Sequence, residues 1–271
     1  MLGAAEGDRA VGSVQNLREE VFAYARKRLE YDPAPLDGPQ SPAWLKENAG
    51  QTISESGIGG HKALEIFSEI LAPATISTDH PNYLSFIPSA PTEASKLFDL
   101  IVSASAIYGG SWMEGAGAVY AENEVLAWLA SEVGLPETAG GVFVQGGTLG
   151  NLSALVAARH SAAKKRTEAG IAQPTKWKFI CSAEAHSSLK SAAAVMDVEV
   201  IKAQVDANGH LRGDSVAAAL SEAGDGVFAI VATAGTTNFG IVDKLDEIAA
   251  IANHNKIWFH VDGRSEEHTS E

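Results

Sequence analysis

The chain has 271 residues, 45% of them hydrophobic, so it holds enough apolar material for one large domain or two small ones. Its formal charge of −14 excludes the basic stripe that nucleic-acid binding requires, and we expect no nucleic-acid partner. No apolar run reaches the roughly 18 residues that a membrane span needs, and the first residues lack the basic and apolar regions of a signal peptide.

The cysteine content points to the same class of protein. A single cysteine, Cys181, cannot form an internal disulfide, and the spacings typical of zinc ligands are missing, so we expect no metal. Its place inside an apolar run predicts a buried residue of a strand. The composition therefore predicts a soluble, cytoplasmic, acidic protein.

The N-terminal part is predicted to be mainly helical. Apolar residues at helical spacing, from Val14 to Leu29, predict a helix over 13–31. Three prolines then predict an extended linker over 32–40. The sequence predicts three further helices, at 61–72, 92–108 and 119–134. A proline-containing loop at 79–91 separates the first two, and a glycine-rich separator at 109–117 separates the last two.

The pattern changes at Gly140, where short apolar runs begin to alternate with amphipathic segments. The runs predict strands at Val142–Val144, Trp177–Cys181, Val198–Ile201, Val227–Thr233 and Ile257–Val261. The segments between them predict helices at 149–168, 187–196, 214–223 and 244–254. This alternation is typical of an α/β fold, a mostly parallel sheet with helices on both faces. Ligands of such sheets bind beyond the carboxyl ends of the strands, so we expect the chemistry there.

The first strand end carries a glycine-rich turn. Gly146, Gly147 and Thr148 precede a long helix, whose free N–H groups can bind an anion such as phosphate. The turn matches neither a Walker A loop nor a Rossmann fingerprint. A tight strand-to-helix turn without a ligand explains it equally well.

The second strand end carries His186. A histidine there can stack on a planar ring or transfer a proton. The alternative is a surface histidine in a loop, with Ser187 or Ser188 capping the next helix.

The last two strand ends carry hydroxyls and a carboxylate. Thr233, Thr236 and Thr237 can bond to a ligand or a neighbouring acid; alternatively they form a polar turn before Asp243, which would cap a helix. Asp262 closes a buried strand, where an ionised carboxylate needs a cation or hydrogen-bond donors. The strand itself supplies no Lys or Arg in position, so a cationic ligand atom is one natural partner and capping of a helix is the alternative.

Taken in order, these motifs resemble those of a known family. Gly-Gly-Thr, Ala-His-Ser-Ser, Ala-Thr-x-Gly-Thr-Thr and His-Val-Asp are similar to motifs of the group II pyridoxal 5′-phosphate (PLP)-dependent amino-acid decarboxylases. That family has the aspartate-aminotransferase-like fold, PLP fold type I. The resemblance spans roughly residues 75–263, and it includes the segments His80–Pro88 and Ser111–Glu114, which resemble parts of the family's active site.

The resemblance implies a role for each matched residue. Gly147 and Thr148 would hold the cofactor phosphate, and Thr233 would lie close to the ring. The catalytic residues would be His186, stacked on the pyridine ring, and Asp262, paired with the pyridine nitrogen, whose pKa the carboxylate would raise. The implied reaction is decarboxylation of an L-amino acid to an amine and CO2. The substrate pocket would include Phe86, Ile87 and Trp112.

The resemblance also suggests how the chain is organised. We expect an N-terminal helical and linker segment over 1–75 and a partial PLP-binding large domain over 76–263, with the C-terminal part missing. Residues 264–271 match the translation of a common sequencing-library adapter, so we expect a non-native tail. The intact enzyme would be a homodimer, with the first helix packed on the partner.

One departure from the family bears on activity. The family's cofactor-bonding lysine lies tens of residues after His-Val-Asp, whereas the last lysine here is Lys256. We therefore expect the chain as given to be inactive and its intact parent to be active.

Other functions remain open at this point. Another fold-type-I enzyme, such as an aminotransferase or a carbon–sulfur lyase, would share the cofactor frame. A non-catalytic α/β domain that binds a nucleotide or sugar phosphate would use the turn at Gly146–Thr148 alone. A fragment that does not fold by itself is the third alternative.

Overall fold

The computed structural model describes residues 4–85 and 90–263 of the chain. It divides into two compact units, Met1–Ile107 and Tyr108–Glu271, each of which is described by itself. Phe86 and Ile87, predicted to line the substrate pocket, lie outside the described residues.

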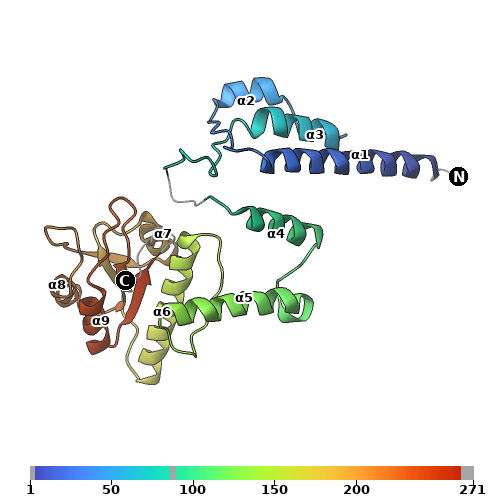
Figure 1. Cartoon of the computed structure of the whole chain (residues 1–271). Helices are drawn as coiled ribbons and strands as arrows, with labels where there is room; N and C mark the ends of the chain where they lie inside the picture. The colour runs from blue at the N-terminus through green and yellow to red at the C-terminus, as the bar shows by residue number, and fades with distance from the viewer. Residues whose placement is uncertain (1–3, 86–89, 264–271) are drawn as a thin grey trace. The chain divides into compact units, whose positions relative to one another are not determined.

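The first unit is helical in its described part (Figure 1). Ser41 begins the second helix by accepting a hydrogen bond from Trp44 N–H at 3.2 Å. Thr92 begins the fourth in the same way, by accepting from Ser95 N–H at 3.2 Å. The elements are α1 (Ala4–Leu29), α2 (Pro42–Ala49), α3 (Gly60–Ile66), the π-helical turn η1 (Phe67–Leu71) and α4 (Glu93–Ala104).

Most sequence predictions for this unit are confirmed with shifted ends. The helix predicted at 13–31 begins earlier, at Ala4, and the one predicted at 92–108 ends at Ala104. The predicted linker at 32–40 contains neither helix nor strand. Helix α2 was not predicted, although Ser41-Pro42 is a typical helix start.

An ion-pair cluster ties the first unit together. The carboxylate of Asp79 accepts from the guanidinium of Arg28 at 2.8 Å and from the ammonium of Lys96 at 2.6 Å. These bonds connect α1 and α4 to the loop between them. The hydrogen bond from Arg28, with that from Lys96, lowers the pKa of Asp79 from 3.8 to about 2, against the opposing effect of its burial.

The second unit holds a four-stranded sheet in its described residues, with strand order β2-β1-β3-β4 and every neighbouring pair parallel. The two central strands, Lys178–Ser182 and Val227–Thr233, are nearly continuous apolar runs, typical of parallel strands buried on both faces, whereas the two outer strands are partly exposed. The elements in chain order are α5 (Trp112–Glu132), α6 (Gly147–Glu168), β1 (Lys178–Ser182), α7 (Ser187–Met196), β2 (Glu199–Ala203), α8 (Gly213–Ala223), β3 (Val227–Thr233), α9 (Leu245–His254) and β4 (Trp258–Asp262).

Helices cover both faces of this sheet, as predicted. One core packs α6 and α7 onto the face that carries Phe179 and Val231. The other packs α8 and α9 onto the face that carries Ile180 and Ile230 (Figure 1). Side chains that alternate along β1 and β3 therefore enter opposite cores. The predicted burial of Cys181, on the α6 and α7 side, is also confirmed.

The strand predicted at Val142–Val144 was wrong. This segment has no regular structure, and no strand pairs with it among the described residues. Its Phe143 N–H donates instead to the carboxylate of Glu122 at 3.0 Å. An apolar run becomes a strand only where a neighbour completes the hydrogen-bonded ladder.

The separator predicted at 109–117 was partly wrong, because α5 begins inside it at Trp112. Gly115 interrupts the helix with φ −127° and ψ 36°. A Cβ atom there would come within 2.5 Å of the carbonyl oxygen of Tyr108, so the close approach requires glycine. The other helices and strands predicted after residue 140 are confirmed, with ends shifted by no more than two residues.

We predict that Asp79→Asn destabilises the first unit by about 1–2 kcal/mol at pH 7, with solvent screening allowed for. Because the pKa of Asp79 is lowered on folding, its contribution is present above the unfolded value of 3.8 and is lost as pH falls towards 2. Urea unfolding from pH 7 down to pH 3 measures the difference between the two proteins, which should narrow as pH falls. Asp99→Asn, at an exposed position of α4, is the matched control and should change stability little. Equal stability of wild type and Asp79→Asn at pH 7 would contradict the prediction.

Candidate functional site

The strand order defines where a ligand can enter the sheet. The chain runs from β1 outward to β2, then crosses back to β3 and on to β4. The order therefore reverses between β1 and β3, and ligands of such sheets bind beyond the carboxyl ends of the strands at this kind of position. His186 follows β1, Thr233 ends β3 and Asp262 ends β4, so three predicted site residues gather at this edge.

Helix α6 presents its N-terminus at the same edge. Its N-cap is Gly146, with φ 87°, and no side chain caps the helix. The N–H groups of Gly147 and Thr148 therefore have no hydrogen-bond acceptor among the described residues. Thr148 is exposed and does not cap the helix. Free N–H groups at the positive end of a helix dipole form an anion-binding site.

One turn further along α6, Asn151 connects the strand ends. It is 4% exposed, and its Nδ2 donates to Asp262 Oδ2 and to Ser188 Oγ, each at 3.0 Å. Its Oδ1 lies 2.8 Å from Nε2 of His260. Asp262 therefore does not cap a helix; it receives its hydrogen bond from a buried amide of α6.

His186 begins helix α7. Its Nδ1 accepts from the backbone N–H of Ser188 at 3.2 Å and lies 2.8 Å from the Oγ of the same residue. The alternative in which Ser187 or Ser188 caps this helix was wrong, because the histidine ring itself is the cap. His186 is half-buried, so part of its ring remains accessible.

Burial favours the neutral form of His260. Burial lowers the pKa of its imidazole below 6.5, and the nearby Asp262 only partly offsets that effect. Asp262 can only accept, so the amide nitrogen of Asn151 must face it and the amide oxygen must face His260. The ring proton of His260 therefore lies on Nε2.

Thr233 combines burial with an unused hydroxyl. It is 4% exposed, and its Oγ1 is a buried polar atom without a hydrogen-bond partner in the described residues. Thr233 lies opposite Asp262 in the β3–β4 register. An orphaned buried hydroxyl next to a carboxylate fits a site that receives a polar ligand.

A second buried carboxylate, Asp243, holds the backbone of Thr233 from the other side. Its Oδ2 accepts from Thr233 N–H at 2.7 Å and its Oδ1 accepts from Leu211 N–H at 2.8 Å. The alternative that Asp243 caps the next helix was wrong, since α9 begins at Leu245 with Lys244 as its N-cap. The carboxylate instead ties the end of β3 to the loop before α8.

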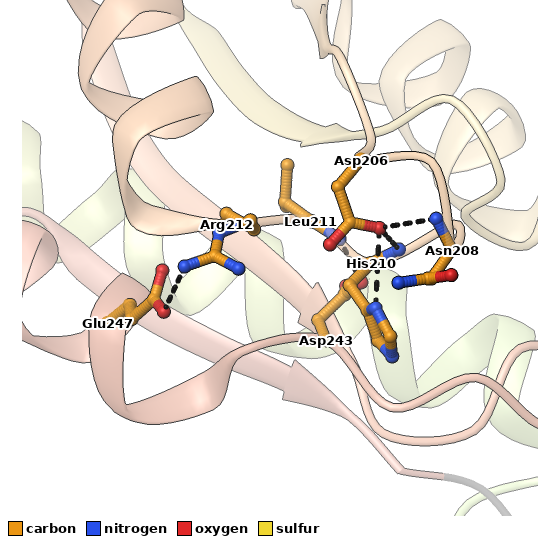
Figure 2. A network of polar contacts seen from close by, with 7 residues as sticks. All are labelled: Asp206, Asn208, His210, Leu211, Arg212, Asp243 and Glu247. Carbon is orange, nitrogen blue, oxygen red and sulfur yellow. Dashed lines mark hydrogen bonds and ion pairs between the residues drawn. The ribbon is translucent and has the colours of Figure 1, made fainter.

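Figure 2 shows the turn that precedes α8 and contains Leu211, one of the two backbone donors to Asp243. The Oδ1 of Asp206 accepts from the backbone N–H of Asn208 at 2.9 Å and of His210 at 3.0 Å, while Arg212 pairs with Glu247 at 2.9 Å. The network fixes the loop that donates to Asp243. Burial raises the pKa of Asp243 above 3.8, and the two backbone donors oppose this shift.

The remaining predicted residues are placed less directly. Trp112 lies at the start of α5 and is 60% exposed. In the described part of the chain, no cluster of three or more His, Cys, Asp or Glu side chains is arranged to hold a metal. No described helix is both long and apolar enough to cross a membrane.

The sequence missed three residues of this site as functional: Asn151, Ser188 and His260. Asn151 and His260 were given no role, and Ser188 was considered only as a possible helix cap. An asparagine inside a helix and a serine near a helix start have no signature of their own, because their roles depend on contacts between residues 37 and 111 positions apart. The histidine two residues before Asp262 was the available signal, since alternate residues of a strand share one face.

Comparison with known proteins agrees with this geometry. The pyridoxal-dependent decarboxylase conserved domain matches residues 45–265. Aromatic-L-amino-acid decarboxylase of Bacillus atrophaeus is 30% identical over 226 residues, which cover 81% of this chain and 45% of that protein. L-2,4-diaminobutyrate decarboxylase of Rhizobium meliloti (strain 1021) is 32% identical over 219 residues, covering 78% and 42% respectively.

A solved structure shows the same fold. It is the glutamate decarboxylase domain of diaminobutyrate-pyruvate transaminase and L-2,4-diaminobutyrate decarboxylase from Vibrio parahaemolyticus. It aligns with a TM-score of 0.74 and 26% identity over 96% of this chain and 58% of that one.

The chain belongs to the pyridoxal-dependent decarboxylase family, since the family's domain matches most of its length. The predicted α/β class, fold type I, is confirmed, and the family's cofactor is PLP. The matches favour decarboxylases over the aminotransferase and carbon–sulfur lyase alternatives. The chain spans about half the length of the relatives it matches, 45% and 42% in these two cases.

We predict that Asp243→Asn destabilises the second unit by about 1–3 kcal/mol at pH 7, because an amide has one oxygen for two backbone donors and turns its NH2 towards the other. Urea unfolding measures the change, with Asp246→Asn on the exposed side of α9 as the matched control. Equal losses in the two variants would show that the tie to Thr233 and Leu211 contributes nothing specific.

Proposed function

We propose that this chain is the cofactor-binding part of an enzyme that decarboxylates an L-amino acid to an amine and CO2 with PLP. The observation that carries the proposal is the convergence of an open helix N-terminus, an orphaned hydroxyl and a half-buried carboxylate at one sheet edge. Family membership supports the same reaction.

The phosphate end of the cofactor fits the start of α6. Gly147 and Thr148 offer two free N–H groups and a hydroxyl. At Gly146 a side chain would meet open space, so the site is accessible, while its φ of 87° favours glycine. A dianionic phosphate gains both the hydrogen bonds and the helix dipole at this position.

The pyridine-ring end of the cofactor fits the carboxyl ends of β3 and β4. Asp262 is half-buried, and Asn151 is the only described side chain that donates to its carboxylate. A second lone-pair direction therefore remains for a protonated pyridine nitrogen, and the opposite charge would hold the proton there. The Oγ1 of Thr233 lies beside this pair and would gain the partner that it lacks.

His186 provides a flat surface between these two ends. Both of its Nδ1 contacts come from Ser188 and hold the ring in place, while the half-buried side chain remains partly accessible. Stacking on a pyridine ring would use a face of the histidine ring. Together with Asp262 and the start of α6, the histidine would define the plane of the cofactor.

The cofactor, when bound, supplies the electron sink for the pair left behind as CO2 departs. The residues named here orient it, hold a proton at the pyridine nitrogen and hold its phosphate. The substrate we propose is a small molecule, an L-amino acid, in line with the relatives' names.

We extend the proposal to the setting of the intact enzyme, a cytoplasmic homodimer. The buried thiol of Cys181 fits a reducing compartment. The exposed apolar side chains of α5, among them Trp128 at 60%, fit coverage by further chain or by a second copy.

We predict that the purified chain binds PLP and that Asp262→Asn weakens this binding about tenfold or more, because the charge partner of the ring nitrogen is lost. The new amide oxygen can still accept from Asn151, so the fold should persist. Isothermal titration with PLP measures both affinities, and Asp246→Asn controls for the loss of a charge. Unchanged affinity in Asp262→Asn would overturn the assignment of the ring end.

A product assay tests the reaction type. With PLP and a panel of L-amino acids, the protein expressed from its full gene should release CO2 and form the amine, whereas the 271-residue chain alone should not, because no lysine follows β4. Formation of a keto acid without CO2 would indicate an aminotransferase instead. CO2 release by the short chain would contradict the predicted need for a later lysine.

A further inference from the structure

We propose that Asn151 and Ser188 are positioning residues, a hydrogen-bonded bridge that holds Asp262 and His186 in one arrangement and keeps the ring proton of His186 on Nε2. The inference rests on the proposed function for its purpose. The bridge itself, defined by the side chains of His186, Ser188, Asn151 and Asp262, is a property of the protein alone.

The direction of each hydrogen bond in the bridge is forced. A carboxylate only accepts, so Asn151 must turn its Nδ2 towards Asp262. The same Nδ2 donates its second hydrogen to Ser188 Oγ. The hydroxyl hydrogen of Ser188 then has one acceptor left at hydrogen-bonding distance, Nδ1 of His186 at 2.8 Å.

The backbone supports the same tautomer, through a longer hydrogen bond than that of the hydroxyl. The N–H of Ser188 points at Nδ1 of His186 at 3.2 Å, and a backbone N–H can only donate. The nitrogen that receives both bonds carries a lone pair, and the ring proton must be on Nε2.

Burial makes the bridge specific. Asn151 is 4% exposed and Ser188 is 2% exposed, so water does not substitute for a missing member. The bridge joins α6, α7 and β4, and it uses both amide hydrogens of Asn151. His260 occupies the amide oxygen and prevents the side chain from flipping.

Its effect at the site follows from these contacts. Without Asn151, Asp262 would lose its described side-chain donor and the rotamer that the bond selects. Without the hydroxyl of Ser188, Nδ1 of His186 would keep only the longer backbone bond. The carboxylate of Asp262 would meet the pyridine nitrogen of the cofactor, and the ring of His186 would stack on its face. One hydrogen-bonded bridge thus positions both side chains.

The test combines histidine tautomers with cofactor affinity. Long-range 1H–15N correlation spectra of histidine-labelled protein without PLP report which ring nitrogen of His186 is protonated. Wild type should show the Nε2–H form. In Asn151→Asp the new carboxylate draws the Ser188 hydroxyl away, and in Ser188→Ala the hydroxyl is removed, so both should show a mixture of tautomers at His186.

Affinity for PLP provides the second readout. We expect titration calorimetry to show a loss of about tenfold or more in Asn151→Asp, where a like charge faces Asp262, and a smaller loss in Ser188→Ala. Asn253→Asp makes the same chemical change at an exposed position of α9, and neither readout should differ from wild type. If Asn151→Asp, at a buried position, fails to fold, Ser188→Ala still tests whether the bridge determines the tautomer of His186.

The outcomes separate this inference from the proposed function. An unchanged Nε2–H signal in a folded Ser188→Ala or Asn151→Asp overturns the bridge as the determinant of the tautomer. Altered tautomers with PLP affinity within about twofold of wild type overturn its role in positioning. Wild-type protein that binds no PLP contradicts the proposed function, while the tautomer spectra still test the bridge.

Discussion

The hydrogen bond from Asn151 to Asp262 is the contact on which the site depends most. The half-buried carboxylate of Asp262 loses part of its hydration and needs donors in return. Asn151 supplies one from a neighbouring helix, while the same Nδ2 also donates to Ser188 and the Oδ1 accepts from His260. The helix that presents the open N-terminus is thereby fastened to the strand that presents the carboxylate, and the two ends of the site keep a fixed separation.

A second carboxylate supports this arrangement from behind. Asp243 uses both oxygens on backbone donors, one of them from Thr233, so it fixes the end of β3 without offering a charge to the site. Burial raises the pKa of Asp243, whereas ion pairing lowers that of Asp79 in the first unit. The same functional group therefore serves as a backbone anchor in one unit and as an ion-pair hub in the other.

The sequence predicted the sheet because β1–β4 are apolar runs long enough to be recognised without their neighbours. It failed at Val142–Val144, where the local pattern is equally apolar but no partner strand is present among the described residues. It singled out Gly147, His186, Thr233 and Asp262 as candidates because each directly follows or ends a strand or begins a helix. It could not identify Asn151, since the role of a helix-interior amide depends on contacts between residues far apart in the chain. The position of Trp112 relative to the strand ends likewise depends on packing that a local pattern does not encode.

A crystal structure of the chain grown with PLP tests the central claim most directly. We expect the phosphate at the N–H groups of Gly147 and Thr148, the ring stacked on His186 and the pyridine nitrogen within hydrogen-bonding distance of Asp262. PLP bound elsewhere, or at this edge with its nitrogen turned away from Asp262, would contradict the assignment of the carboxyl end of the sheet as the cofactor site.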